Sequence, residues 1–204
     1  SRINNFGVSK AKGEFLLLLN NDTEMIDPDS IKNMLAVAHL PNVGAVGARL
    51  YYEDGTIQHA GVTLGVGGIA ANAFSGAKRD DPGYMNRICV MQELSAVTAA
   101  CLLMKRKDFE EISGFTEELA VAFNDVDLCM KLREKGRFII YYPFAAFFHY
   151  ESKSRGVEDT PKKVKRFNSE IDFFRERWEK ELLKGDPYYN QYLNLNINDH
   201  SLMP

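Results

Sequence analysis

Residues 15–24, Phe15-Leu16-Leu17-Leu18-Leu19-Asn20-Asn21-Asp22-Thr23-Glu24, join an uninterrupted apolar run to a polar cluster. An apolar run without alternation is typical of a strand buried on both faces, as in a parallel sheet covered by helices. Ligands of open α/β sheets bind just beyond the carboxyl ends of such strands. Asn20 and Asp22 stand there two residues apart, so their side chains can point the same way. The stretch therefore predicts an α/β fold with a ligand site at the end of this strand.

An amide oxygen and a carboxylate in these positions can bind a hard divalent cation, and that cation can bind a diphosphate. Asn and Asp are also common in plain turns, where their side chains bond to the local backbone. These ten residues alone leave both interpretations open.

The composition limits the class of protein. The chain has 204 residues, of which 45% are hydrophobic and 26% charged, and its formal net charge is −3. These values are ordinary for a globular domain and give no general footprint for nucleic acid. No apolar run reaches the about 18 residues that a membrane span requires. Cys89, Cys101 and Cys129 form no CxxC pair, so we expect reduced cysteines and a cytoplasmic location.

Hydrophobic periodicity and turn residues predict alternating helices and strands. We expect helices at 3–11, 28–40 (capped by Asp27), 107–113, 124–136 (capped by Asn124 or Asp125) and 161–184, strands at 15–19, 43–50 and 138–142 (closed by Pro143), one or two strands within 89–105, and a hairpin through Asp54-Gly55. Residues 61–87, with six glycines, predict a long loop with short helical pieces. The last twenty residues predict a loose polar tail. We divide the chain into a domain at 1–160 and an appendage at 161–204.

Polar residues that could carry chemistry gather at three places, namely Asn20 and Asp22, then Asn124, Asp125 and Asp127, then His149 and Glu151. Carboxylates in the first turn of a helix are favoured by the helix dipole alone. An aspartate that faces a cleft can also act as a general base. A histidine after an apolar run is either a core residue or a functional one. The residues themselves leave these alternatives open.

Four motifs follow one another along the chain: Leu19-Asn20-Asn21-Asp22-Thr23-Glu24, Gly114-Phe115-Thr116-Glu117-Glu118, Phe123-Asn124-Asp125-Val126-Asp127-Leu128-Cys129, and His149-Tyr150-Glu151-Ser152-Lys153-Ser154-Arg155-Gly156. In this order they resemble the family 2 glycosyltransferases, most of all the O-antigen and rhamnan-type branch. His59-Ala60-Gly61 and Val97-Thr98-Ala99-Ala100 fit the same family. The resemblance covers residues 3 to about 160.

The resemblance implies a GT-A fold, a mixed sheet flanked by helices. It implies an inverting transfer of a sugar from a nucleotide diphosphate sugar to a saccharide or lipid-linked saccharide, in the synthesis of cell-surface polysaccharide, with Mn²⁺ or Mg²⁺ as cofactor. It also implies that most of the nucleotide-binding βαβ half, roughly 60–90 residues, lies outside these 204 residues. We therefore expect these residues alone to be inactive and unable to bind a nucleotide sugar tightly.

By position in the motifs, Asp22 matches the main metal carboxylate, with Asn20 in place of a first aspartate. His149 matches a histidine that completes the metal and diphosphate site. Asp125 matches the catalytic base. The remaining matches are Asn21, Lys153 and Arg155 near the donor diphosphate, and Asn124, Asp127, His59 and Thr98 near the acceptor or the sugar. Charged residues such as Lys153 and Arg155 are more often solvated loop charges than ligand-binding residues, and this alternative stays open.

Two rival functions compete with glycosyl transfer. One is a non-catalytic glycan-binding or scaffold module, and the other is a Mg²⁺-dependent phosphohydrolase, for which Asp22 lacks a lysine partner. The basic first turn of the helix at 161–184 is either solvated or contacts anionic lipid. The second alternative would place the protein peripherally at the inner face of a membrane.

Overall fold

The computed structural model describes residues 1–150, 160–196 and 200–203. In these residues seven strands form one mixed sheet of order β1-β8-β3-β9-β2, with β4 paired to β3 and β7 paired to β9. The seven are β1 (Phe15–Leu19), β2 (Thr23–Met25), β3 (Val43–Tyr51), β4 (Ile57–His59), β7 (Gln92–Glu93), β8 (Cys101–Lys105) and β9 (Phe138–His149). β3 and β9 are parallel, and the other pairs are antiparallel.

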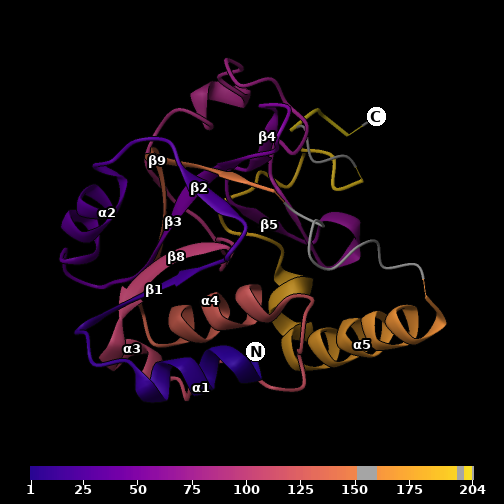
Figure 1. Ribbon diagram of the computed structural model, residues 1–204. Coiled ribbons are helices and arrows are strands. Elements are labelled where there is room, and N and C mark those ends of the chain that lie inside the picture. Colours follow the sequence, from indigo (N-terminus) through magenta and orange to yellow (C-terminus); the bar gives the residue numbers. More distant parts are fainter. Residues whose placement is uncertain (151–159, 197–199, 204) are drawn as a thin grey trace.

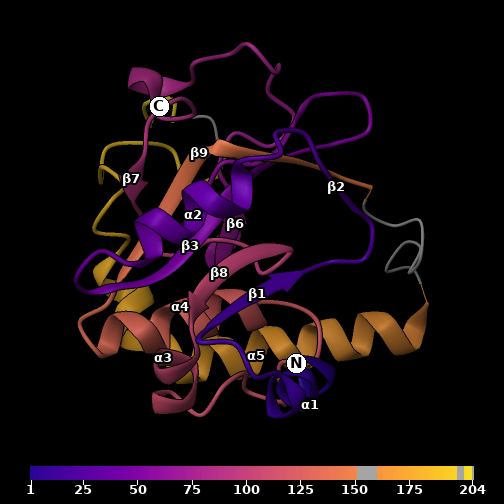
Figure 2. The same ribbon diagram turned by 60° about the vertical axis from the view of Figure 1, so that its left-hand side comes forward.

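Helices cover both faces of this sheet. They are α1 (Arg2–Lys10), α2 (Ser30–Ala38), α3 (Arg106–Glu111), α4 (Asn124–Glu134) and α5 (Pro161–Lys184). Figures 1 and 2 both place α2 on one side of the sheet and α4, with α5 beyond it, on the other. The chain thus has the helix–sheet–helix layers that the sequence predicts.

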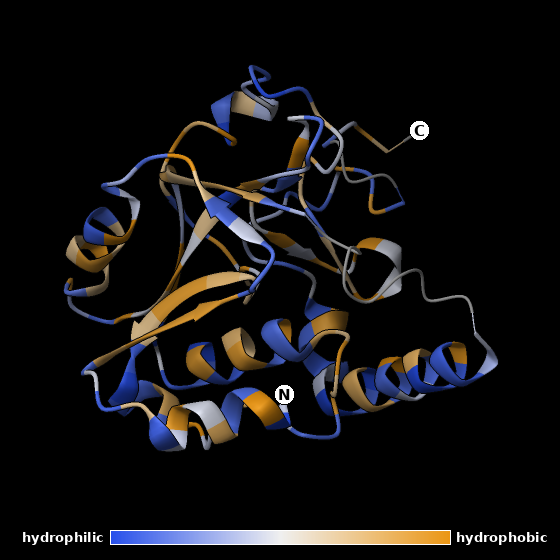
Figure 3. Cartoon of the chain, in the orientation of Figure 1, coloured by the Kyte–Doolittle hydropathy of each residue, from blue (hydrophilic) through white to orange (hydrophobic). Residues whose placement is uncertain are grey.

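The strand β8 shows why both faces are covered. Leu102 and Met104 belong to the core that contains α4, whereas Cys101 and Leu103 belong to the core that contains α2. Successive side chains of a strand point to opposite faces, so an apolar run without alternation supplies both cores. The strands β1 and β8 are accordingly hydrophobic along their length in Figure 3.

The predicted bounds of the first strand are confirmed, but its predicted parallel neighbours are not. Within the described residues β1 pairs only with β8, in antiparallel orientation, and stands at the edge of the sheet. Leu16 and Leu18 are buried, while Leu19 is 46% exposed. The expectation of a parallel strand buried on both faces was therefore wrong here, because an apolar run does not specify the direction of its partner.

Two element ends also differ from the predictions. Helix α2 begins at Ser30, after a turn in which the Asp29 backbone N–H donates to Asp27 Oδ1 (2.9 Å), so Asp29 and not Asp27 is the N-cap. Strand β9 continues through Pro143, because its register against β3 jumps from Tyr142 to Ala146. An irregularity of this kind accommodates a proline, which cannot donate to the ladder.

Of two other predicted helix starts, the cap of α4 was wrong and the start of α5 is confirmed. The N-cap of α4 is Phe123, with φ of 58°, and not Asn124 or Asp125. Helix α5 has the predicted bounds, and its cap Thr160 accepts a hydrogen bond from the Lys163 backbone N–H.

Residues 61–87 contain a second, two-stranded sheet that the sequence did not predict, formed by β5 (Val62–Leu64) and β6 (Ala70–Asn72). Two single turns of 3₁₀ helix, Val66–Gly68 and Tyr84–Asn86, match the predicted helical pieces.

The described part of the last twenty residues is packed, and the prediction of a loose tail was wrong. Asp186 Oδ2 accepts a hydrogen bond from the Leu64 backbone N–H (2.7 Å), and the Leu195 carbonyl accepts one from the Gly67 N–H (3.1 Å). Tyr189 and Leu193 are buried. A few apolar side chains among the asparagines suffice to hold the segment.

Among the described helices, none is both long enough and apolar enough for a membrane crossing.

Candidate functional site

The end of β9 lies against the loop that joins β1 to β2. Thr23 of β2 pairs with His149 of β9, and the Tyr150 backbone N–H donates to the Asp22 carbonyl (2.8 Å). These backbone contacts bring together three side chains from distant parts of the sequence. His149 Nε2 lies 3.1 Å from Asn20 Nδ2 and 3.2 Å from Asp22 Oδ1. The predicted contact between the first and third polar clusters is therefore present.

The donor atoms of this group fit a divalent cation. Asp22 Oδ1 is buried and has no hydrogen-bond partner among the residues that the structure describes, which is rare for a carboxylate oxygen. Two ligands of an octahedral Mn²⁺ or Mg²⁺ at adjacent positions lie about 3 Å apart. The 3.2 Å between Asp22 Oδ1 and His149 Nε2 matches that spacing. A mixed carboxylate and imidazole set suits Mn²⁺ at least as well as Mg²⁺.

The protein supplies only part of a coordination shell. No group of three His, Cys, Asp or Glu side chains in the described ranges is placed to hold a metal ion. The third candidate ligand is the amide of Asn20, whose oxygen would face His149 after a half-turn of the side chain. Cations with so few protein ligands in enzymes usually complete their shell with water and substrate phosphate.

A three-residue segment, Thr98–Ala100, ties Asp125 to the same end of the sheet. The Ala100 carbonyl accepts a hydrogen bond from the Asn20 backbone N–H (2.9 Å). The Ala99 backbone N–H donates to Asp125 Oδ2 (3.1 Å), and the Val126 N–H donates to Asp125 Oδ1 (2.9 Å). Asp125 is half-buried, so its carboxylate is both fixed in orientation and partly accessible.

His59 belongs to the framework of this segment. Its Nε2 accepts a hydrogen bond from the Thr98 backbone N–H (3.3 Å), and its Nδ1 donates to Asn72 Oδ1 (2.7 Å). The ring is 1% exposed, and burial lowers the pKa of His59 to about 4 despite the Asn72 bond and the nearby Asp125 charge. The predicted contact of His59 with a sugar does not fit this structure, because the neutral ring is enclosed.

Asp127 is also a framework residue. It is 0% exposed, and its oxygens accept hydrogen bonds from Thr116 Oγ1 (2.6 Å) and Trp178 Nε1 (3.0 Å). Arg177 and Lys131 add charged contacts at 3.0 and 3.5 Å. The predicted contact of Asp127 with an acceptor does not fit, because every one of these partners is internal to the chain.

Three other predicted residues lie on the elements that form the site. Asn21 is exposed in the β1–β2 turn, Asn124 is half-buried in the first turn of α4, and Thr98 Oγ1 accepts a hydrogen bond from the Ala100 N–H (3.3 Å). Lys153 and Arg155, like Glu151, lie outside the described residues.

Sequence reasoning missed Gln58. Its side chain is 3% exposed and bonds to both the ring and the carbonyl of His149. The signal was a glutamine inside the buried strand β4, where an amide must find partners.

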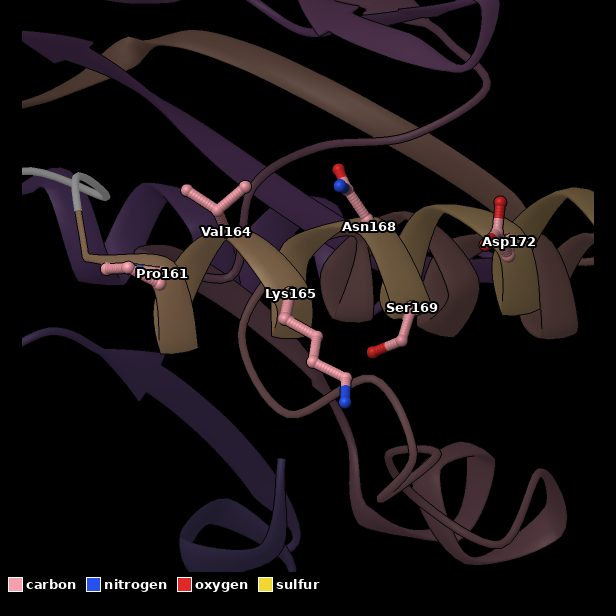
Figure 4. Close-up of a pocket in the computed structure, with 6 residues that line it drawn as sticks. All are labelled: Pro161, Val164, Lys165, Asn168, Ser169 and Asp172. Atoms are coloured by element: carbon pink, nitrogen blue, oxygen red, sulfur yellow. The ribbon is translucent and has the colours of Figure 1, made fainter.

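Two surface hollows lie at the end of β9 and along α5. One of about 280 Å³ is lined by Tyr52, Glu53 and Asp54 of the hairpin together with His149 and Tyr150. The other, of about 640 Å³, lies along the first half of α5, and all six lining residues, shown in Figure 4, belong to that helix. In Figure 4 Val164 and Asn168 point to one side of the helix while Lys165 and Ser169 point to the other. None of the predicted site residues lines this second hollow.

Known proteins with similar sequences are much longer than this chain. It is 46% identical over 203 residues to the uncharacterized protein y4gI of Sinorhizobium fredii, and 34% identical over 209 residues to the O-antigen biosynthesis protein RfbC of Myxococcus xanthus. These alignments cover 99% and 98% of this chain but 22% and 15% of the relatives. No family model matches the chain.

A third relative is the N-acetylglucosaminyl-diphospho-decaprenol L-rhamnosyltransferase of Mycobacterium tuberculosis. It is 24% identical over 176 residues, which are 80% of this chain and 56% of that protein.

Solved structures establish the fold. The mannosyltransferase PcManGT of Pyrobaculum calidifontis, in complex with GDP-Man and Mn²⁺, matches with a TM-score of 0.54 at 16% identity, over 86% of this chain and 42% of its own. GalNAc-T7, with UDP, GalNAc and Mn²⁺, matches with a TM-score of 0.58 at 13% identity, over 96% of this chain and 38% of its own. The chain has the GT-A fold, as the sequence motifs predicted.

Proposed function

We propose that this chain carries the catalytic centre of an inverting, metal-dependent glycosyltransferase. It would move a sugar from a nucleotide diphosphate sugar to a hydroxyl of a saccharide or lipid-linked saccharide. The observation that carries the proposal is the meeting of Asp22 Oδ1 and His149 Nε2 at 3.2 Å, with Asp125 joined to the same end of the sheet through Thr98–Ala100.

In this proposal Asp22, His149 and the Asn20 amide hold Mn²⁺ or Mg²⁺. The bound cation neutralises the negative charge that grows on the diphosphate leaving group. The solved structures with the same fold support a divalent metal and a nucleotide sugar, because both contain Mn²⁺ with a nucleotide or nucleotide sugar.

Asp125 acts as the general base. The acceptor hydroxyl attacks the anomeric carbon from the face opposite the leaving group, which inverts the configuration, and its proton passes to a carboxylate oxygen of Asp125. Two backbone N–H donors fix that carboxylate at the start of α4, and a base fixed in this way needs no reorganisation during the reaction. Asn21, in the β1–β2 turn, would contact the donor, and Asn124, in the first turn of α4, would contact the acceptor.

The names of two relatives favour cell-surface polysaccharide as the product. One acts in O-antigen biosynthesis, and the other is named for a decaprenol-linked saccharide acceptor. A lipid-linked acceptor would bring the reaction to the cytoplasmic face of a membrane.

The base can be tested by Asp125→Asn in the protein that carries this chain. We expect kcat to fall about 10²- to 10⁴-fold, because an amide cannot accept the proton, while donor binding stays within a few-fold. The measurement is release of nucleoside diphosphate from a panel of uridine, guanosine and thymidine diphosphate sugars in the presence of a lipid-linked saccharide.

Glu134→Gln is the matched control, since it makes the same carboxylate-to-amide change at an exposed position in the last turn of the same helix. Wild-type rates in Asp125→Asn would contradict the proposed base. A non-catalytic module would show no transfer in any of the three proteins.

A further inference from the structure

We propose that Gln58 is a positioning residue that fixes the tautomer of His149 and so keeps the Nε2 lone pair open toward Asp22. The inference rests on the proposed metal site and adds to it a residue that touches neither metal nor substrate. It depends on the two hydrogen bonds that the Gln58 side chain makes to His149.

The position of the proton follows from what each atom can donate or accept. The His149 backbone carbonyl lies 3.3 Å from one end of the Gln58 amide, and a carbonyl only accepts, so that end is the NH₂ group. The other end is therefore Oε1, which also only accepts. It lies 2.6 Å from His149 Nδ1, so Nδ1 carries the proton.

A neutral imidazole with its proton on Nδ1 has a lone pair on Nε2. That lone pair lies 3.1 Å from the Asn20 amide nitrogen, which can donate to it, and 3.2 Å from Asp22 Oδ1, which cannot. Two acceptor atoms thus face each other in a place where His149 is 8% exposed and Asp22 Oδ1 is buried. A cation between them would satisfy Asp22 Oδ1 and would replace the Asn20 N–H at the Nε2 lone pair, while the half-turn of the Asn20 amide would bring its oxygen toward the metal.

Without Gln58 the opposite tautomer would be favoured. A proton on Nε2 could then be donated to Asp22 Oδ1, which would close the pair into an ordinary hydrogen bond and occupy both metal ligands. Gln58 prevents this by holding the proton on the far nitrogen. Such partners of ligating histidines typically alter metal affinity by 10- to 100-fold when they are removed.

The direct test is the ¹⁵N spectrum of the imidazole rings in the metal-free protein at neutral pH, with His149 assigned by its loss in His149→Ala. We expect the wild type to show the Nδ1–H tautomer at His149. Gln58→Met keeps the length of the side chain but removes both hydrogen-bonding groups, and it should shift the ring toward Nε2–H. Gln58→Glu keeps an acceptor for Nδ1, so it should retain the wild-type tautomer.

The second readout is Mn²⁺ affinity, measured by electron paramagnetic resonance with the metal alone. We expect Gln58→Met to weaken binding about 10- to 100-fold and Gln58→Glu to restore it to within a few-fold. Gln92→Met is the matched control: the Gln92 amide donates to the Arg87 carbonyl, and its strand pairs with Tyr141, far along β9 from His149. It should change neither the tautomer nor the affinity.

The outcomes separate this inference from the proposed function. If Mn²⁺ binds to the wild type and is lost in His149→Ala, but Gln58→Met alters neither tautomer nor affinity, the positioning role is wrong and the metal site stands. If the wild type binds Mn²⁺ no better than His149→Ala, both fail. Thermal melts check that each variant is folded, and should Gln58→Met unfold, an Nε2–H tautomer in the wild type or in Gln58→Glu would still refute the inference.

Discussion

His59 and His149 show how the same residue type serves two purposes. Each donates from Nδ1 to a side-chain amide oxygen, that of Asn72 for His59 and that of Gln58 for His149. The Nε2 of His59 is satisfied by a backbone N–H, whereas the Nε2 of His149 faces a carboxylate oxygen. The sequence motifs predicted the meeting of Asn20, Asp22 and His149, but they could not separate these two histidines, because the difference depends on partners from other strands.

The buried His59 predicts a pH dependence of stability. Its pKa is lowered to about 4 by burial, below the 6.5 of an exposed histidine, so the unfolded chain binds a proton between these values and the folded chain does not. Protonation of His59 in the unfolded chain favours unfolding. The free energy of unfolding therefore has its full value above pH 6.5 and decreases as the pH falls toward 4. Between pH 7 and pH 5 this group should lower the free energy of unfolding by about 2 kcal/mol.

Urea denaturation at pH 7 and at pH 5 measures this effect. In His59→Gln, the decrease in the free energy of unfolding between these pH values should be smaller than in the wild type by about 2 kcal/mol. His39→Gln makes the same substitution at an exposed position and is the matched control. An unchanged pH dependence in His59→Gln would show that the ring is not held neutral.

At the scale of elements, Asp127 joins α4 to α5. Its carboxylate bonds to Trp178 and Arg177 of α5 and to Lys131 of its own helix, while burial lowers the pKa of that lysine. Periodicity predicted both helices, and α5 to its exact ends, but it could not show that this acidic residue faces the neighbouring helix. The short strands β2, β5 and β6 were missed for a related reason, since three-residue strands are defined by pairing more than by composition.

Removing the Asp127 carboxylate leaves the buried Lys131 ammonium without its counter-charge and the buried Trp178 indole N–H without its acceptor. We expect Asp127→Ala to lower the free energy of unfolding by roughly 3–5 kcal/mol, measured from the urea midpoint and slope at pH 7. Asp172→Ala, at an exposed position of α5, should change it by less than about 0.5 kcal/mol. A sugar-binding role for Asp127 would instead predict a stable variant with weakened acceptor binding.

At the scale of the whole molecule, the order of the motifs along the chain was the strongest predictor. It predicted the GT-A layers and the approach of the β1–β2 loop to the end of β9, although residues 22 and 149 are far apart in sequence. It could not predict how residues 185–196 fold back on β5, because those contacts depend on a few side chains, such as Asp186, in a polar segment. The chain spans 22% and 15% of two of its longer relatives, so its contacts with the rest of such proteins lie beyond this sequence.

The central claim is that Asp22 and His149 hold a divalent cation at the end of the sheet. The most direct measurement is anomalous diffraction at the manganese edge from crystals of the protein that carries this chain, grown with Mn²⁺ and a nucleoside diphosphate. We predict a peak within about 2.4 Å of both Asp22 Oδ1 and His149 Nε2, in contact with the diphosphate. A bound nucleotide whose manganese lies elsewhere, or no peak between these two atoms, would contradict the account.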